Sequence, residues 1–427
     1  MPKKNLYLVI LSFLLAGPSH AVYEAHEWGT FTSVVDSTGK TLNGMYHEDE
    51  SLPDFVHSFG ELRKEAQLPI PPVVSNPPKP PRPPCHSKVC FGQDELIQNV
   101  ITQKMETPVI YFYAKEAQKV AVDVKFPEGI ITETFPGPVA TFPTMSDPHI
   151  IGSGHSVFDL NILQTKVGAL PEVNSDNIYG HARAVASNLV KSGVEQEKFL
   201  FYRGLGRFQP KIEITSQGGS LKIAGLAKAR PQNAFLIHVD ANGDGQLLSL
   251  DNVKTKDEIF VLSQQIDQLK DHSSATTLII KGQQARGKLI DELLLAGLFK
   301  DEAVAMLNTW ENGYLKVPGL RLLYILPRFE VDEVLPLNFT PAPVKLVRAF
   351  VARMEIILDT DEQRILAEIT KEQSQFRIEK LGRFAEPVLH RIRKLSEETL
   401  AEPATINVID QLLKQAQVSF EASSSVH

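Results

Sequence analysis

The spacing of hydrophobic residues changes partway along this chain of 427 residues, and the change limits which folds it can adopt. Hydrophobic and other residues alternate through 120–126, as in a strand with one buried face, and similar segments fill 104–142. A second region of short β-like segments runs through 198–260, where glycine-containing turns separate them. We therefore predict antiparallel strands through 104–260, arranged like a β-sandwich.

Further along the chain the hydrophobic residues follow a helical spacing. They recur every three or four positions through 259–269 and 289–307, and again through 344–358 after two prolines. Residues 261–421 are therefore predicted to be mainly helical, with one strand near 320–326.

These patterns together predict an α+β protein. N-terminal and central antiparallel β-sandwich-like modules are expected to precede a mainly helical C-terminal region. The composition, 43% hydrophobic and 22% charged, is that of a chain with packed cores. The short polar segment 422–427 is predicted to be a disordered tail.

Residues 1–21 have the features of a cleavable signal peptide. Two lysines precede the apolar stretch 6–16, and small residues stand at the two positions that a signal peptidase reads before Val22. The alternative is a membrane anchor, but Gly17 and Pro18 interrupt the apolar stretch well short of a membrane span. We expect a protein that is exported to the periplasm or the medium.

The segment 22–103 is predicted to hold N-terminal strands and a proline-rich loop at 69–84. The only two cysteines, Cys85 and Cys90, follow this loop directly. Outside the reducing cytoplasm such a pair is expected to form a disulfide. The alternative is half of a metal site with His86, although a zinc site needs further ligands nearby.

The charge of the chain narrows the classes of partner. It carries 44 Lys and Arg against 51 Asp and Glu, a net charge of −7, and both signs are scattered along the sequence. Nucleic-acid binders concentrate basic residues on one face, so we expect no nucleic-acid partner. No stretch after the signal peptide is apolar and long enough to span a membrane, so a soluble mature protein is expected.

One segment resembles a calcium-binding loop. Asp240, Asn242, Asp244 and Gln246 occupy ligand or adjoining positions, and Asp251 stands where a twelfth-position carboxylate belongs. The preceding segment, however, has the pattern of a strand instead of the expected helix. Asn-Gly and Asp-Gly are also common tight-turn pairs, so the alternative is a plain hairpin that binds no metal.

Histidines and carboxylates are spread over the first part of the sequence without a specific motif. A metal-dependent hydrolase site could be assembled from His26, Glu27, His47, His149 and His155 if the fold brings them together. None of these residues has the spacing of a helical zinc site. The alternative for each is an ordinary hydrogen-bonded structural role.

Three segments resemble an uncharacterised family of exported bacterial proteins. They are 26–32 (HEWGTFT), 104–113 (KMETPVIYFY) and 199–204 (FLFYRG). The resemblance implies a single architecture over most of the chain and export from the cytoplasm. It implies no activity, substrate or catalytic residue.

The sequence thus predicts an exported, soluble and non-catalytic protein that binds a ligand or associates with the cell envelope or a protein partner. A metal-dependent hydrolase is the alternative, and calcium is the one cofactor that the sequence suggests.

Overall fold

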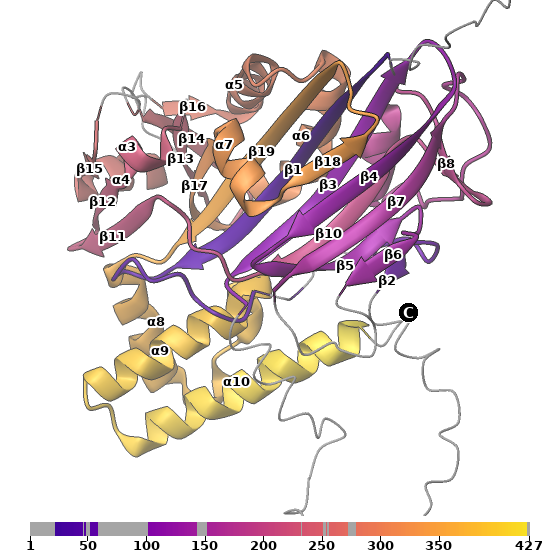
Figure 1. Ribbon diagram of the computed structural model, residues 1–427. Coiled ribbons are helices and arrows are strands. Elements are labelled where there is room, and N and C mark those ends of the chain that lie inside the picture. The colour runs from indigo at the N-terminus through magenta and orange to yellow at the C-terminus, as the bar shows by residue number, and fades with distance from the viewer. Residues whose placement is uncertain are drawn as a thin grey trace, which may run out of the picture.

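A large mixed β-sheet forms the centre of the computed structural model (Figure 1). The structure describes residues 22–45, 47, 52–58, 101–142, 152–231, 233–250, 253, 256–271 and 279–424. Across the sheet the strands are β16 (Ile279–Lys281), β14 (Gly245–Leu250), β13 (Ala234–Val239), β17 (Gly319–Ile325), β19 (Lys345–Ile356), β1 (Tyr23–Val35), β3 (Gln103–Ala114), β10 (Leu200–Gly206), β5 (Gly129–Phe135) and β2 (His57–Ser58).

The middle of this sheet is a parallel pair, β1 and β19. The register places Glu24 opposite Lys345 and Val35 opposite Ile356. Other layers cover both faces of the sheet here, so nearly every residue of the two strands is buried. The α+β class predicted from the sequence is confirmed, but this pair makes the sheet mixed instead of wholly antiparallel.

A second sheet of six strands covers one face of the large sheet. Val120, Val122, Val124 and Phe126 of β4 share a hydrophobic core with Phe31 of β1, which confirms the alternation predicted for this strand. The strands of this sheet are β18 (Leu337–Thr340), β4 (Gln118–Phe126), β7 (Gly154–Ile162), β8 (Val190–Ser192) and β9 (Glu195–Glu197), with β6 (Ala140–Phe142) paired to β7.

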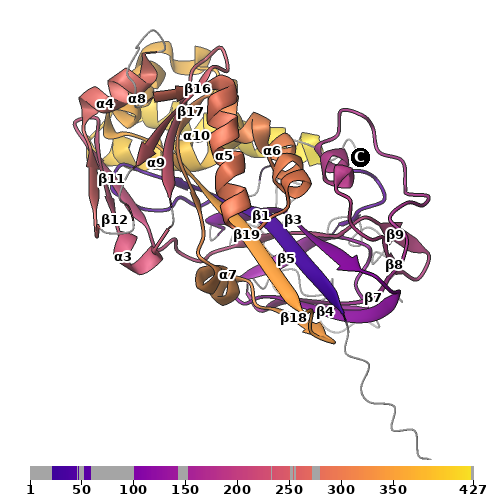
Figure 2. The ribbon, with the colours of Figure 1, turned by 90° about the horizontal axis from the view of Figure 1, so that it is seen from above.

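Helices cover the opposite face of the large sheet. Figure 2 shows α5 (Gly282–Leu295) and α6 (Lys300–Leu315) across β1 and β19, on the side away from β4 and β7. The short helix η1 (Ile178–Ala184) packs against α6. Trp28, Tyr111 and Leu323 point from the sheet into this layer and form its core with the helices.

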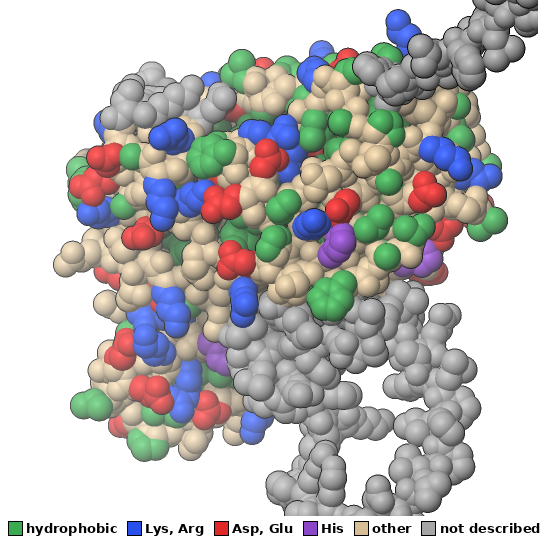
Figure 3. Space-filling model, viewed as in Figure 1, with side chains coloured by type: hydrophobic (Ala, Val, Ile, Leu, Met, Phe, Trp, Pro, Cys, Tyr) green, Lys and Arg blue, Asp and Glu red, His purple; other side chains and the backbone are tan. Residues whose placement is uncertain are grey.

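Smaller elements complete one end of the large sheet. They are a three-stranded sheet of β11 (Glu213–Gln217), β12 (Ser220–Ala224) and β15 (Ile259–Val261), with α3 (Leu226–Ala229) and α4 (Ser263–Lys270). Helix α7 (Arg328–Val334) instead packs against β19. On the face drawn in Figure 3, acidic and basic side chains are interspersed. None of the described helices is long and apolar enough to cross a membrane.

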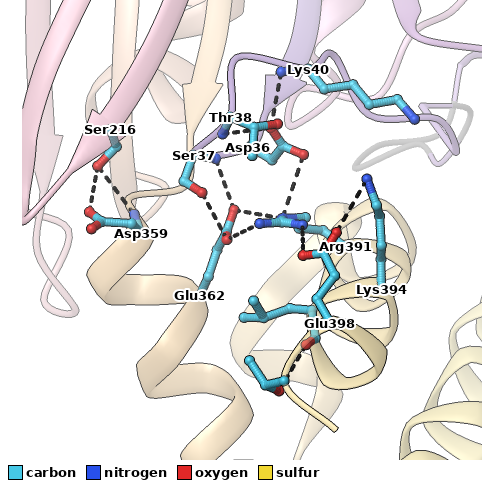
Figure 4. A network of polar contacts seen from close by, with 12 residues as sticks. Asp36, Ser37, Thr38, Lys40, Ser216, Asp359, Glu362, Arg391, Lys394 and Glu398 are labelled. Atoms are coloured by element: carbon cyan, nitrogen blue, oxygen red, sulfur yellow. Dashed lines mark hydrogen bonds and ion pairs between the residues drawn. The ribbon is translucent and has the colours of Figure 1, made fainter.

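A buried ion network attaches the last helices to the large sheet (Figure 4). Glu362 accepts hydrogen bonds from the amide and hydroxyl of Ser37, at 2.8 and 2.9 Å, and from Nε and Nη2 of Arg391, at 2.9 and 2.7 Å. Arg391 also lies 3.5 Å from a carboxylate oxygen of Asp36, just beyond β1. The helices are α8 (Asp359–Glu372), η3 (Gln373–Gln375), η4 (Ile378–Phe384), α9 (Ala385–Glu398) and α10 (Pro403–Ser424).

The helix predicted over 344–358 is wrong, because this segment is strand β19. From Val347 onward every residue of the strand is buried, including Arg348 and Arg353. A strand covered on both faces has no alternating pattern. In β19 the buried charged residues stand at positions where a helix would have its polar face, so the spacing resembled that of a helix. The short strands β16 and β18 were also missed, and α10 includes 422–424, which were predicted to be a disordered tail.

Candidate functional site

A groove of about 550 Å³ opens where the two large sheets meet at their edges. Strand β2 is the last strand of the central sheet, and β9 is the last strand of the six-stranded sheet. Residues from both strands, from the end of β5 and from the 169–171 segment form its wall. They are Asp54, Phe55, Val56, His57, Phe135, Ala169, Leu170, Pro171, Val194, Glu195 and Gln196.

The polar feature of this groove is a pair formed by His57 and Glu195. His57 Nε2 lies 2.6 Å from Glu195 Oε1, and the amide of Gly137 donates to Glu195 Oε2 at 2.7 Å. A Cβ atom on Gly137 would lie 3.1 Å from His57 Nε2, so glycine gives the ring room to approach. Because a carboxylate only accepts, the proton of a neutral His57 belongs on Nε2, and Nδ1 keeps a lone pair.

The remaining wall of the groove is mainly hydrophobic. Phe55 and Phe135 pack with their ring centres 4.7 Å apart, and the His57 ring stacks on Phe135. Val194, in the turn between β8 and β9, is 94% exposed at the rim. The guanidinium of Arg183 lies 5.6 Å from the Phe55 ring centre. A fixed aromatic wall beside one polar pair is typical of a small-ligand site.

His26 and Glu27, two candidates from the sequence, point to opposite faces of β1. His26 Nδ1 lies 2.9 Å from a carboxylate oxygen of Glu302 on α6, in the helical layer. Glu27 is buried toward the second sheet, where it accepts hydrogen bonds from Tyr202 and Arg348. Neighbouring residues of a strand alternate in direction, so these two cannot act on one ligand.

The other histidine candidates are also held apart. His47 Nε2 lies 2.9 Å from Glu386 on α9, whereas His155 Nε2 lies 2.6 Å from Asp123 on the neighbouring strand. His149 lies outside the described residues. Each described histidine candidate therefore has a different carboxylate partner, and in the described part of the chain these candidates are not brought together. Nor does any group of three or more His, Cys, Asp or Glu side chains there lie close enough to hold a metal ion.

The calcium-like segment forms a hairpin between β13 and β14. Val239 pairs with Gly245, and Asp240 Oδ1 accepts the amides of Asn242 and Asp244 at 2.8 and 3.0 Å. Gly243 has a φ of 83°, which glycine adopts easily. The strand predicted before the turn is confirmed, while Gln246 is buried within β14.

Calcium binding by this hairpin stays a prediction, since Asp251 lies outside the described residues. Asp240 Oδ1 is already engaged by two amides of the turn. We therefore expect the melting temperature to be the same with calcium as with a chelator. A melting temperature that rises with calcium and saturates would instead establish the site.

Three further predictions fall on parts of the chain that are not described: the signal peptide at 1–21, the proline-rich loop at 69–84 and the disulfide between Cys85 and Cys90. His57 is not among the site residues that the sequence predicts. Glu195 lies 138 positions away, in a short strand with no pattern of its own, so no signal in the sequence pointed to the pair.

Comparisons with protein-family models, curated proteins and solved structures found no match to this chain, so the candidate site rests on its own geometry.

Proposed function

We propose that this chain is an exported binding protein whose groove holds a small ligand with a hydrophobic body and a positively charged end. The observation that carries this proposal is the His57–Glu195 pair, set into an apolar wall and still partly exposed. The stacked sheets act as a sandwich-like scaffold, and the loops at their edges form the site. The periplasm or the medium is the proposed place of action.

The size and charge of the groove support this class of ligand. A volume of about 550 Å³ lies within the usual range for small-molecule sites. Asp54 and Glu195 are the two carboxylates of the wall, which contains no lysine or arginine among its described residues. A cation is attracted to such a wall, whereas an anion is repelled.

The arrangement of the polar pair also suits ligand binding. Glu195 holds the His57 ring in place, which reduces the entropy that a ligand hydrogen bond to Nδ1 costs.

Two probes with the same ring and opposite charge test the proposal: tryptamine, a cation, and indole-3-acetate, an anion. We expect tryptamine to bind with measurable heat in calorimetry and indole-3-acetate to bind at least about tenfold more weakly. Glu195→Gln removes a charge and loosens His57, so it should weaken tryptamine binding about tenfold as well. Asp54→Asn, at an exposed position, should have a smaller effect.

Glu213→Gln is the matched control, because Glu213 is an exposed carboxylate on β11, in the small sheet. It should leave the affinity for tryptamine unchanged. Equal affinities for the two probes, no tryptamine binding, or equal effects of the Glu195 and Glu213 variants would each contradict the proposed function.

A further inference from the structure

Three polar residues form a row across the middle of the large sheet. Thr32 of β1 is paired with Lys104 of β3 on one side and with Arg353 of β19 on the other. In register, paired residues point to the same face, and this face carries the helices. All three side chains are almost completely buried. We call these residues the cationic row.

The guanidinium of Arg353 has an incomplete set of partners. Its Nε donates to Glu355 at 2.6 Å, and its central carbon lies 5.5 Å from the Phe384 ring centre. Nη1 lies against Gly313, since a Cβ atom there would be 2.6 Å away. Yet among the described residues Nη1 and Nη2 have no hydrogen-bond partner, and neither has the hydroxyl of Thr32. A buried charged donor without a partner is costly, so a missing acceptor is the simplest explanation.

The pKa values around the row indicate a positive potential. Burial alone would raise the pKa of Glu106, but the charges of Arg383, Lys104 and Arg353 outweigh it and lower this pKa to about 2. Burial also lowers the pKa of Arg321 to about 10, although a neighbouring carboxylate opposes the change, and the charge of Arg353 adds to it. A negative ligand is therefore favoured here, and a cation is disfavoured.

We propose that the cationic row binds a small oxyanion. The two free Nη nitrogens of Arg353 donate to two of its oxygens, and the Thr32 hydroxyl also donates to the anion. The planar fork matches two oxygens of a phosphate, sulfate or carboxylate group. The site is independent of the groove and its proposed ligand, because it lies on other strands and takes the opposite charge. Since the row is enclosed, the anion binds as the protein folds or through local opening, and it stabilises the folded state.

The test is the melting temperature of the full chain in phosphate, sulfate or acetate, each compared with chloride at equal ionic strength. We expect the wild type to show a rise that saturates with phosphate concentration, and the sulfate and acetate series identify the anion that fits best. Arg353→Met should abolish the saturable rise. Gly313→Ala should raise the apparent Kd for phosphate at least about tenfold, because the added Cβ atom displaces Nη1 of Arg353 while the charge of the arginine remains.

Arg364→Met serves as the control, since this exposed arginine pairs only with its helix neighbours Asp361 and Glu368 among the described residues. It should keep the wild-type response. A stabilisation that grows without saturation and equally in all variants is the general effect of such salts and would overturn the proposal. So would the absence of any response, which would leave trapped water as the partner of Arg353. If Arg353→Met fails to fold, Gly313→Ala and phosphorus NMR line broadening in the wild type decide the question.

Discussion

Replacing Arg348 with methionine is expected to lower the free energy of unfolding by about 3–5 kcal/mol, the usual cost of leaving a buried charge without its partner. Arg348 and Glu27 face each other on β19 and β1, and both side chains are fully buried. Nη1 of Arg348 also donates to Asp332 and to the carbonyl of Leu335, each at 2.8 Å. Burial alone would lower the pKa of this arginine, but the charge of Glu27 holds it above its usual value.

Urea unfolding of the variants measures this effect. Arg364→Met, at an exposed arginine with helix-neighbour ion pairs, should cost no more than about 0.5 kcal/mol. The double variant Glu27→Gln with Arg348→Met should recover part of the loss, because the uncompensated carboxylate is then gone. If Arg348→Met costs no more than Arg364→Met, the buried pair does not stabilise the sheet.

The second large effect is expected from Glu330→Gln and depends on pH. Glu330 lies on α7 and is 2% exposed, and its Oε2 has no hydrogen-bond partner in the part of the chain that the structure describes. Burial raises its pKa from 4.5 to about 7, although the charge of Lys211 opposes the shift. The protonated form is favoured in the folded state, so its contribution is complete below pH 4.5 and is lost as the pH rises through about 7.

A shift of this size corresponds to about 3 kcal/mol. We therefore expect Glu330→Gln to stabilise the protein by about that amount at pH 8, and by less than about 1 kcal/mol at pH 5. Thermal melting across this pH range is the measurement. Glu379→Gln, at an exposed carboxylate, is the control and should follow the wild type. A wild type and a Glu330 variant with parallel pH profiles would show that this carboxyl titrates normally.

The helices and strands that could be predicted from the sequence are those with one face buried and the other exposed to water. Strand β4 alternates because one of its faces is buried against the large sheet, and α10 begins at Pro403, a residue suited to the first helical position. Strand β19 could not be recognised, because two layers bury it and charges lie inside it. Its true neighbours, β1 and β17, are set by long-range pairing that a local pattern does not record.

The candidate sites were hidden for the same reason. Glu195 meets His57 only because two sheet edges converge, and Arg353 meets Thr32 only through the pairing of β19 with β1. Residue type was informative where the partner was local, as in the Asp240 turn. Where the partner lay more than a hundred positions away, as for His26 with Glu302 and His47 with Glu386, the sequence identified the histidine as a candidate but not its partner.

The parallel pairing of β1 with β19 also bears on the order in which the chain folds. Strand β1 cannot pair with β19 until the segment that begins at Lys345 has been synthesised. The centre of the sheet therefore stays incomplete while the ribosome makes most of the protein. Contacts between such distant positions close slowly, because a long loop must first be ordered. For the exported protein that we propose, this delay is useful, because the polypeptide can cross the membrane before the centre of the sheet closes.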